Sequence, residues 1–314
     1  MQLRGGWVSV FIIACSLAAS GTAAADAAPP AGPEAAPAAD DSTAAATTGS
    51  DEPVIETEAP PKDAPWSIAT DLETFSLTAD ARGLSLHKPM YLLPATYSGR
   101  YPGEDSEVLF SISLKFRVYR KLPLYFGYSQ KSYFQAFNGS DSKPFRDNNF
   151  NPEVFFRLKP KKPEKWLNLA ADVGIEHESN GRSLPDSRSW NRLYITPYWQ
   201  SNKTLVWWKW WWRIPEDQKR APTDPKRDDN PDIQDYLGYS EVKIQQQLFD
   251  HHQVSSTLRF NPTTGRGSAS LIYTVPGPGD GFFWTFYAFN GYGESLLDYD
   301  RSVTRVGIGI SVAR

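Results

Sequence analysis

Several stretches of the chain alternate apolar and polar residues with a period of two. In the segment 108–118 every even position is apolar, from Val108 to Val118, while the odd positions from 111 onward are Ser, Ser, Lys and Arg. The segment 166–179 repeats the pattern, with apolar residues at the odd positions from Leu167 to Ile175. Successive side chains of a β-strand point to opposite faces, so each segment is predicted to form a strand with one apolar face.

Ten further segments have the same character, which gives twelve predicted strands in all. They lie at 86–98, 122–136, 148–158, 188–200, 203–214, 232–249, 252–262, 266–275, 281–291 and 301–313. Turn-rich stretches such as 160–164 and 276–281 separate them, and short connections alternate with long ones, as at 201–203 and 216–232. The chain is therefore predicted to be all-β.

Two architectures fit this alternation: a soluble sandwich with its apolar faces inward, and a membrane barrel with its apolar faces outward. The N-terminus favours the barrel. Residues 1–25 carry Arg4, an apolar run from Trp7 to Ala19 and small residues at 23–25, which is the pattern of a cleavable signal peptide. The other interpretation, a single anchoring helix, needs a longer apolar run. We expect a twelve-stranded antiparallel transmembrane β-barrel in the outer membrane of a Gram-negative bacterium.

The composition defines the remaining regions and excludes some partners. The 314 residues carry 33 basic and 36 acidic side chains, a net charge of −3, so no nucleic-acid partner is expected. Residues 26–65 are rich in Ala and Pro with almost no large apolar residue, and we predict a disordered linker there, followed by the barrel domain at 66–314. Aromatic runs such as 207–212 and 282–284 are candidates for the interfacial girdles of a barrel.

Polar residues interrupt the outward face of the strand predicted at 166–179. By parity, His177 and Ser179 lie on the apolar face of that strand, where lipid is expected and polar side chains are costly. In the next strand Asn191 shares the face of Leu193 and Ile195, and antiparallel pairing would bring Asn191 close to His177. The three types suit Ser179 as nucleophile, His177 as general base and Asn191 as the group that orients the imidazole. Alternatively, they are polar residues at the headgroup boundary.

These residues lie in a longer motif. The segment 177–194 reads HESNGRSLPDSRSWNRLY and resembles the active-site hairpin of outer membrane phospholipase A. The similarity extends to YSQ at 128–130, PFR at 144–146, DNPDI at 229–233 and GYGESLLDY at 291–299. The resemblance implies a calcium-dependent phospholipase A1/A2 and lysophospholipase, in which Ser179, His177 and Asn191 hydrolyse the acyl esters of membrane phospholipids.

The resemblance also implies a calcium ion and an active homodimer. The implied calcium ligands are the backbone carbonyl of Arg182, the side chain of Ser187 and, from the partner protomer, Ser142, with Asp229 as a further candidate. Oxygen donors of this kind suit a hard cation. The backbone N–H of Gly181 would stabilise the oxyanion together with the metal.

Gln130 is a candidate for the dimer interface. Leu124, Phe126 and Tyr128 direct the even face of the strand at 122–136 toward lipid, so Gln130 would project an amide into hydrocarbon. An unpaired amide there is costly, and Gln130 of a second protomer would satisfy it, as the resemblance implies. Alternatively, Gln130 lies high enough to reach the headgroups.

A non-catalytic barrel, such as a porin or a structural protein, is the rival class of function. In such a barrel the polar faces of the strands would line a channel with charged side chains, here Lys115, Arg117, Asp172 and Glu176. In a ring of only twelve strands, side chains of this length are expected to fill the interior by pairing with one another.

Overall fold

The structure is a computed structural model that describes residues 75–78, 83–159, 169–221, 224, 227–278 and 282–314. The predicted signal peptide at 1–25 and the predicted linker at 26–65 lie outside the described residues. None of the described helices has the length and apolar character needed to cross a membrane.

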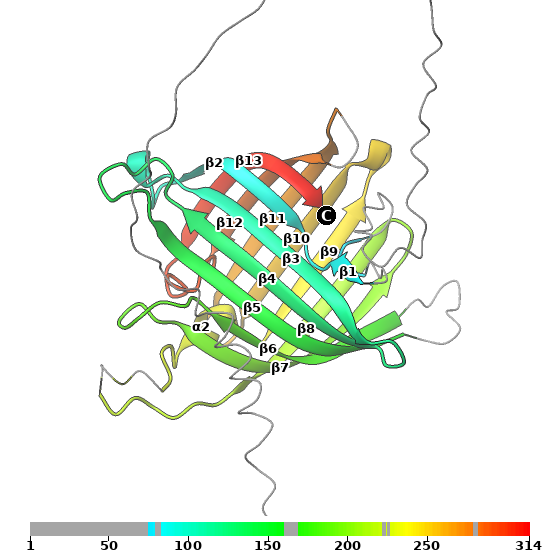
Figure 1. The fold of residues 1–314 in the computed structure, drawn as a ribbon, viewed down its shortest axis with the longest axis horizontal. Helices are drawn as coiled ribbons and strands as arrows, with labels where there is room; N and C mark the ends of the chain where they lie inside the picture. Colours follow the sequence, from blue (N-terminus) through cyan, green and yellow to red (C-terminus); the bar gives the residue numbers. More distant parts are fainter. Residues whose placement is uncertain (1–74, 79–82, 160–168, 222–223, 225–226, 279–281) are drawn as a thin grey trace, which may run out of the picture. The chain divides into compact units, whose positions relative to one another are not determined.

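The described chain consists almost entirely of antiparallel strands (Figure 1). The strands are β1 (Leu84–Leu86), β2 (Met90–Ser98), β3 (Val108–Tyr119), β4 (Leu124–Phe134), β5 (Phe145–Leu158), β6 (Leu169–Ser179), β7 (Ser189–Gln200), β8 (Thr204–Ile214), β9 (Ser240–Gln247), β10 (Gln253–Asn261), β11 (Arg266–Pro276), β12 (Phe283–Gly291) and β13 (Val303–Ala313). Three short helices accompany them: η1 (Gly103–Asp105), α2 (Ile233–Leu237) and η2 (Phe249–His251).

The strands β2 to β13 form a closed ring. Each pairs with its neighbours in chain order, and β13 returns to pair with β2. The short strand β1 and the strand β2 pair with the same edge of β3. Between them the chain is interrupted at Pro89, which has no backbone N–H to donate to the ladder. The strand predicted at 86–98 is therefore divided. The prediction of a twelve-stranded antiparallel barrel is confirmed.

The segment predicted as one strand at 232–249 is a helix followed by a strand. Residues Ile233 and Leu237, four positions apart on α2, are both buried, and they pack into the barrel against Trp190 and Trp211. Gly238, at φ 70°, ends the helix before β9 begins. A helix of five residues is too short for its hydrophobic pattern to be distinguished from the alternating pattern of a strand.

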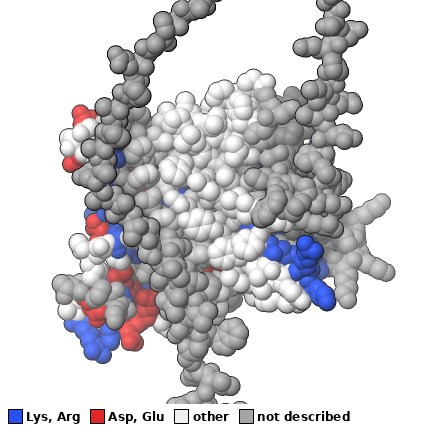
Figure 2. Space-filling view, in the orientation of Figure 1, with Lys and Arg blue, Asp and Glu red and all other residues white. Residues whose placement is uncertain are grey.

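The outer wall of the barrel is apolar. Figure 2 shows that charged side chains gather toward the two ends of the barrel face in view, with few across the wall between them. On β8, Trp208, Trp210 and Trp212 are exposed on this wall, whereas Trp207 and Trp211 are buried inside the barrel. Only alternate residues of the run 207–212 therefore contribute to the outer aromatic surface, because neighbouring side chains of a strand point to opposite faces.

The inner wall is lined by buried ion pairs. Arg157 binds Asp172, while Glu176 lies within 2.7 Å of Lys209 and 3.1 Å of Arg192. Lys115 is fully buried and donates to backbone carbonyls. Arg117 differs from the expectation, since it is exposed and donates to the carbonyl of Leu122 beside the turn after β3. The predicted pairing of charges inside the barrel thus holds for Asp172 and Glu176, whereas the buried Lys115 ammonium contacts backbone carbonyl oxygens.

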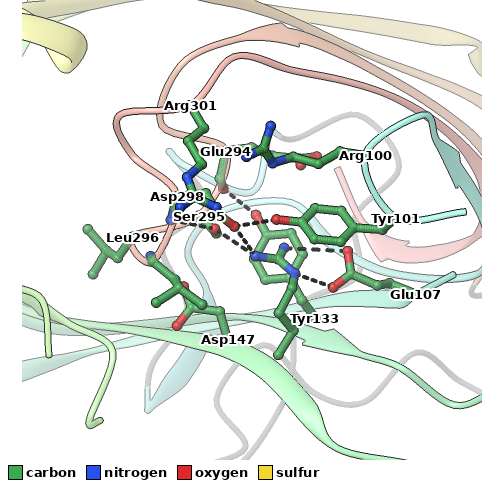
Figure 3. A network of polar contacts seen from close by, with 12 residues as sticks. Arg100, Tyr101, Glu107, Tyr133, Asp147, Glu294, Ser295, Leu296, Asp298 and Arg301 are labelled. Carbon is green, nitrogen blue, oxygen red and sulfur yellow. Dashed lines mark hydrogen bonds and ion pairs between the residues drawn. The ribbon is translucent and has the colours of Figure 1, made fainter. Parts of the chain in front are cut away.

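A second network lies where loop 292–302, between β12 and β13, meets loop 99–107. Arg146 binds both Glu107 and Asp298, and Arg305 binds Glu107 at 2.5 Å and Glu294 at 2.8 Å. Figure 3 shows Tyr101, Glu107, Ser295 and Asp298 converging from the two loops. These side chains pair their charges with one another, as expected for the interior of a ring of twelve strands.

Candidate active site on the outer wall

His177 and Asn191 face each other across the β6–β7 ladder. The two residues are register partners, and His177 Nδ1 lies 2.9 Å from Asn191 Oδ1. Both side chains are partly exposed and share the outward face with Leu193, as the parity of the two strands predicted. Because opposite residues of an antiparallel pair have their Cβ atoms about 5 Å apart, the ladder itself holds this contact.

Ser179 lies two residues after His177 and shares its outward face. Its register partners are Ser189 on β7 and Phe150 on β5. Among the described residues no hydrogen bond joins Ser179 Oγ to His177. Catalytic hydrogen bonds are often loose before substrate binds, so this geometry is compatible with a nucleophile beside its base.

Ion pairs hold the two strands of the same hairpin together on its inner face. Arg192, next to Asn191, binds Glu176 and Glu178, the two residues that flank His177. The Trp190 Nε1–H also donates to Glu178 at 3.1 Å, and the Arg192 guanidinium stacks 3.8 Å from the Trp190 ring centroid. These buried contacts restrain the backbone beneath the polar residues of the outer face.

Loop 180–188 connects the two strands and is held by Asn180, a residue that the sequence analysis did not single out. Its side-chain oxygen accepts from the N–H groups of Arg182 and Arg188, and its amide donates to the carbonyl of Asp186. Gly181 follows at φ 65°, a conformation that favours glycine. In the sequence, the one signal that could have indicated a role for Asn180 is its position directly after Ser179 in the motif.

Two of the four predicted calcium ligands are in contact. Ser187 Oγ donates to Asp229 Oδ2 at 2.5 Å, although 42 residues separate them. The other oxygen, Asp229 Oδ1, is buried and lies 2.5 Å from Lys219 Nζ. The hydroxyl and carboxylate oxygens are hard donors, so this pair fits a calcium ion. Within the described part of the chain, no cluster of three or more His, Cys, Asp or Glu side chains could hold a metal.

The other two predicted calcium ligands are not joined to this pair. Ser142 is exposed in loop 135–144 at φ 57°, and no hydrogen bond links it to Ser187 or Asp229 among the described residues. Arg182 is in the same loop as Ser187, and its guanidinium binds Asp186 at 2.8 Å. Among the described residues, the one hydrogen bond between side chains of the predicted calcium ligands is thus that of Ser187 with Asp229.

Two residues from the segment after β8 also contact the hairpin, and the sequence analysis missed both roles. Asn230 is fully buried, and its side-chain oxygen accepts from the N–H of Ser189 at 2.9 Å. Glu216 Oε1 accepts from Asn191 Nδ2 at 3.0 Å. Burial raises the pKa of Glu216, an effect reinforced by Asp228 and Asp229 and opposed by the Asn191 hydrogen bond and by Arg213.

Comparison with known proteins identifies the family. The family model for phospholipase A1 matches residues 71–312. The chain belongs to the phospholipase A1 family. A phospholipase A1 from Escherichia coli strain K12 is 36% identical over 222 residues, which cover 69% of this chain and 73% of the relative.

Solved structures of family members share the fold. Outer membrane phospholipase A from Escherichia coli aligns with a TM-score of 0.61 and 32% identity, covering 71% of this chain and 95% of that chain. One structure of that protein is an active-site mutant in which an asparagine is replaced with alanine. The Salmonella typhi outer membrane phospholipase, a dimer with bound calcium, aligns with a TM-score of 0.61 and 31% identity, covering 71% of this chain and 90% of that chain.

Membership of the phospholipase A1 family, together with the closed barrel, makes this chain an outer-membrane protein of a Gram-negative bacterium, as predicted. The site described above therefore lies on a wall that faces lipid.

Gln130 lies on the outward side of β4, and its side-chain amide forms hydrogen bonds within that strand. Tyr128 donates to Gln130 Oε1 at 2.9 Å, and Gln130 Nε2 donates to Ser132 Oγ at 2.9 Å.

Proposed function

We propose that this chain hydrolyses the acyl esters of membrane phospholipids, acting as a phospholipase A1/A2 and lysophospholipase at the outer-membrane surface. The observation that carries the proposal is the His177–Asn191 hydrogen bond on the outer wall of a barrel that belongs to the phospholipase A1 family. The active-site asparagine of the Escherichia coli relative supports a catalytic role for Asn191. A lipid in the bilayer would reach this wall without entering the lumen.

The proposed reaction begins with attack by Ser179. His177 Nε2 takes the proton from Ser179 Oγ as that oxygen bonds to the ester carbonyl carbon, and the carbonyl electron pair moves onto its oxygen. The carbon–oxygen bond to the glycerol then breaks, and His177 returns the proton to the leaving alkoxide. Water attacks the acyl-enzyme in the same way, which releases a fatty acid and restores Ser179. Asn191 keeps the imidazole oriented throughout.

The oxyanion requires donors beside Ser179. We assign the backbone N–H of Gly181 to this role, because the glycine follows Ser179 in the loop and has the left-handed conformation that such loops use. Calcium, when bound by Ser187, Asp229 and the carbonyl of Arg182, would supply positive charge near the developing oxyanion. The contact between the Ser187 hydroxyl and the Asp229 carboxylate supports this assignment.

We assign the active form to a homodimer. Ser142 of one chain is exposed and could reach the calcium of a second chain, and Gln130 would lie at the contact between the two outer walls. The Salmonella typhi relative, a dimer with bound calcium, supports this arrangement. Calcium and association together would then complete a site that a single chain leaves unfinished.

The test is release of fatty acid from phospholipid by the purified protein in detergent. Ser179→Ala is expected to lower the rate by about 10³-fold or more, because it removes the nucleophile. Ser183→Ala, an exposed serine of the same loop, is the matched control and should keep the wild-type rate. Removing calcium with a chelator should abolish release, and adding calcium back should restore it. Equal rates for Ser179→Ala and wild type would refute the catalytic assignment.

A further inference from the structure

The side-chain amide of Asn191 is bonded at both of its ends. Its oxygen lies 2.9 Å from His177 Nδ1, and its nitrogen donates to Glu216 Oε1 at 3.0 Å. Glu216 is thus the next member of a chain of contacts that runs from the imidazole into the segment after β8. The inference below rests on the proposed function.

The fold brings Glu216 to this position through the strand register. Ile214, the last residue of β8, is the register partner of Asn191. Pro215 follows and restricts the backbone as the chain leaves the sheet. Glu216 therefore extends from a strand end that is fixed beside Asn191. Its partial burial reduces the competition of water for the hydrogen bond.

An amide can present either its oxygen or its nitrogen to a neighbour, and the two choices have opposite consequences here. If the Asn191 oxygen faces His177, then Nδ1 must carry the proton, and the lone pair of Nε2 remains free for Ser179. If the nitrogen faced His177, then Nδ1 would have to accept, the proton would sit on Nε2, and the imidazole could not act as the base. The direction of the amide therefore decides the tautomer.

A carboxylate removes this ambiguity because it only accepts hydrogen bonds. We propose that Glu216 is a positioning residue, which holds Asn191 with its nitrogen outward and its oxygen toward His177 and so selects the catalytic tautomer of the imidazole. Glu216 does not touch the reacting atoms. Its effect reaches Ser179 only through Asn191 and His177.

The test is a series of substitutions that differ in what residue 216 can donate. Glu216→Gln can still accept with its side-chain oxygen and is expected to keep kcat within about threefold of wild type. Glu216→Ala leaves the amide unrestrained and is expected to lower kcat about tenfold. Glu216→Lys can only donate, which favours the wrong amide direction, and kcat should fall about 10²-fold or more. A residue with a merely structural role would not produce this order.

The matched control is Asp217→Lys, which makes the same change of charge one residue further along. The Asp217 side chain is 82% exposed, and its one ion pair among the described residues is a 3.6 Å contact with Arg227. Its substitution should leave kcat unchanged. Circular dichroism and gel mobility of the unheated barrel would verify that every variant is folded.

A second set of variants separates this inference from the proposed function. In an Asn191→Ala background the three Glu216 substitutions should differ by less than about twofold, because the amide that transmits their effect is absent. If Asn191→Ala lowers kcat but the Glu216 series follows no donor order, the role of Glu216 is overturned and the triad stands. If neither Asn191→Ala nor Ser179→Ala lowers kcat, the proposed function itself fails.

Discussion

The carboxylate of Asp229 already forms an ion pair, with the ammonium of Lys219. One oxygen accepts from Ser187, and the other lies 2.5 Å from the ammonium of Lys219. The side chains of Asp229 and Lys219 are 8% and 20% exposed, so the pair is only weakly screened by water. A calcium ion bound by Asp229 would have to displace this ammonium. Lys219 is therefore expected to lower the calcium affinity of the site.

Lys219→Gln should strengthen calcium binding. We expect a decrease in the dissociation constant of about three- to tenfold, because a competing positive charge is removed while the oxygen donors remain. Calorimetric titration of calcium into the purified barrel measures the change. Lys121→Gln, an exposed lysine in the turn between β3 and β4, is the control. If Ser187→Ala abolishes binding while Lys219→Gln leaves the affinity unchanged, the competition does not occur.

The two faces of the β6–β7 hairpin carry different kinds of side-chain contact. His177, Ser179 and Asn191 lie on the outer face, and the inner face carries the ion pairs of Arg192 with Glu176 and Glu178. Since alternate residues of one strand serve both faces, movement of the inner network would shift the outer residues. The position of β6 against β5 should therefore be sensitive to small changes of volume.

Gly174 on β6 tests this sensitivity. A methyl group there would lie 2.5 Å from the carbonyl oxygen of Val154 and 2.7 Å from Cβ of Phe155 on β5, so the strands would have to separate. Gly174→Ala is expected to lower the free energy of unfolding by about 2 kcal/mol, measured by urea denaturation. Gly99→Ala is the control, because the same methyl group there meets nothing within 4 Å. Equal unfolding midpoints for the two variants would contradict the expected crowding.

The chemistry proposed for this barrel lies on its outer wall. Its interior is lined by paired charges and by the apolar side chains of α2, whereas the residues proposed for catalysis and for association lie on the outer wall. Under the proposed function, a lipid substrate and a second copy of the chain would both approach this wall from the bilayer. Association of two barrels can therefore alter the site without any change inside the lumen.

Gln130→Ala should weaken the proposed dimer. Its amide bonds to Tyr128 and Ser132 within the strand, which leaves one N–H for a second chain. We expect the calcium-dependent association constant to fall about three- to tenfold, as for other polar contacts between membrane segments. Sedimentation velocity in detergent measures the dimer fraction. Asn290→Ala is the control, because this exposed amide also bonds within its own chain, to Thr304 on β13. A similar loss for both variants would remove Gln130 from the interface.

Alternation along the chain was enough to predict most of the strands and the shared face of His177, Ser179 and Asn191, and the signal-like N-terminus favoured a barrel over a sandwich. The reason is local: in a strand every second side chain points the same way, and consecutive strands of a barrel pair in antiparallel order. The same rule failed at α2, whose two buried residues are too few to define a helical period, and at Pro89, which divides the first strand. In the run 207–212, by contrast, the rule agrees with the structure, in which Trp208, Trp210 and Trp212 are exposed and Trp207 and Trp211 are buried.

The sequence by itself thus determined most of the strands and the outward face shared by His177, Ser179 and Asn191, and from that face it predicted the His177–Asn191 contact. Only the tertiary structure decided the contacts of the loops: Asn180 with its own loop, Ser187 with Asp229, and Asn191 with Glu216. Loop residues have no fixed period, so their direction depends on the packing of segments that are far apart in the chain. The strands position the proposed catalytic residues, and the loops supply polar neighbours of the same site.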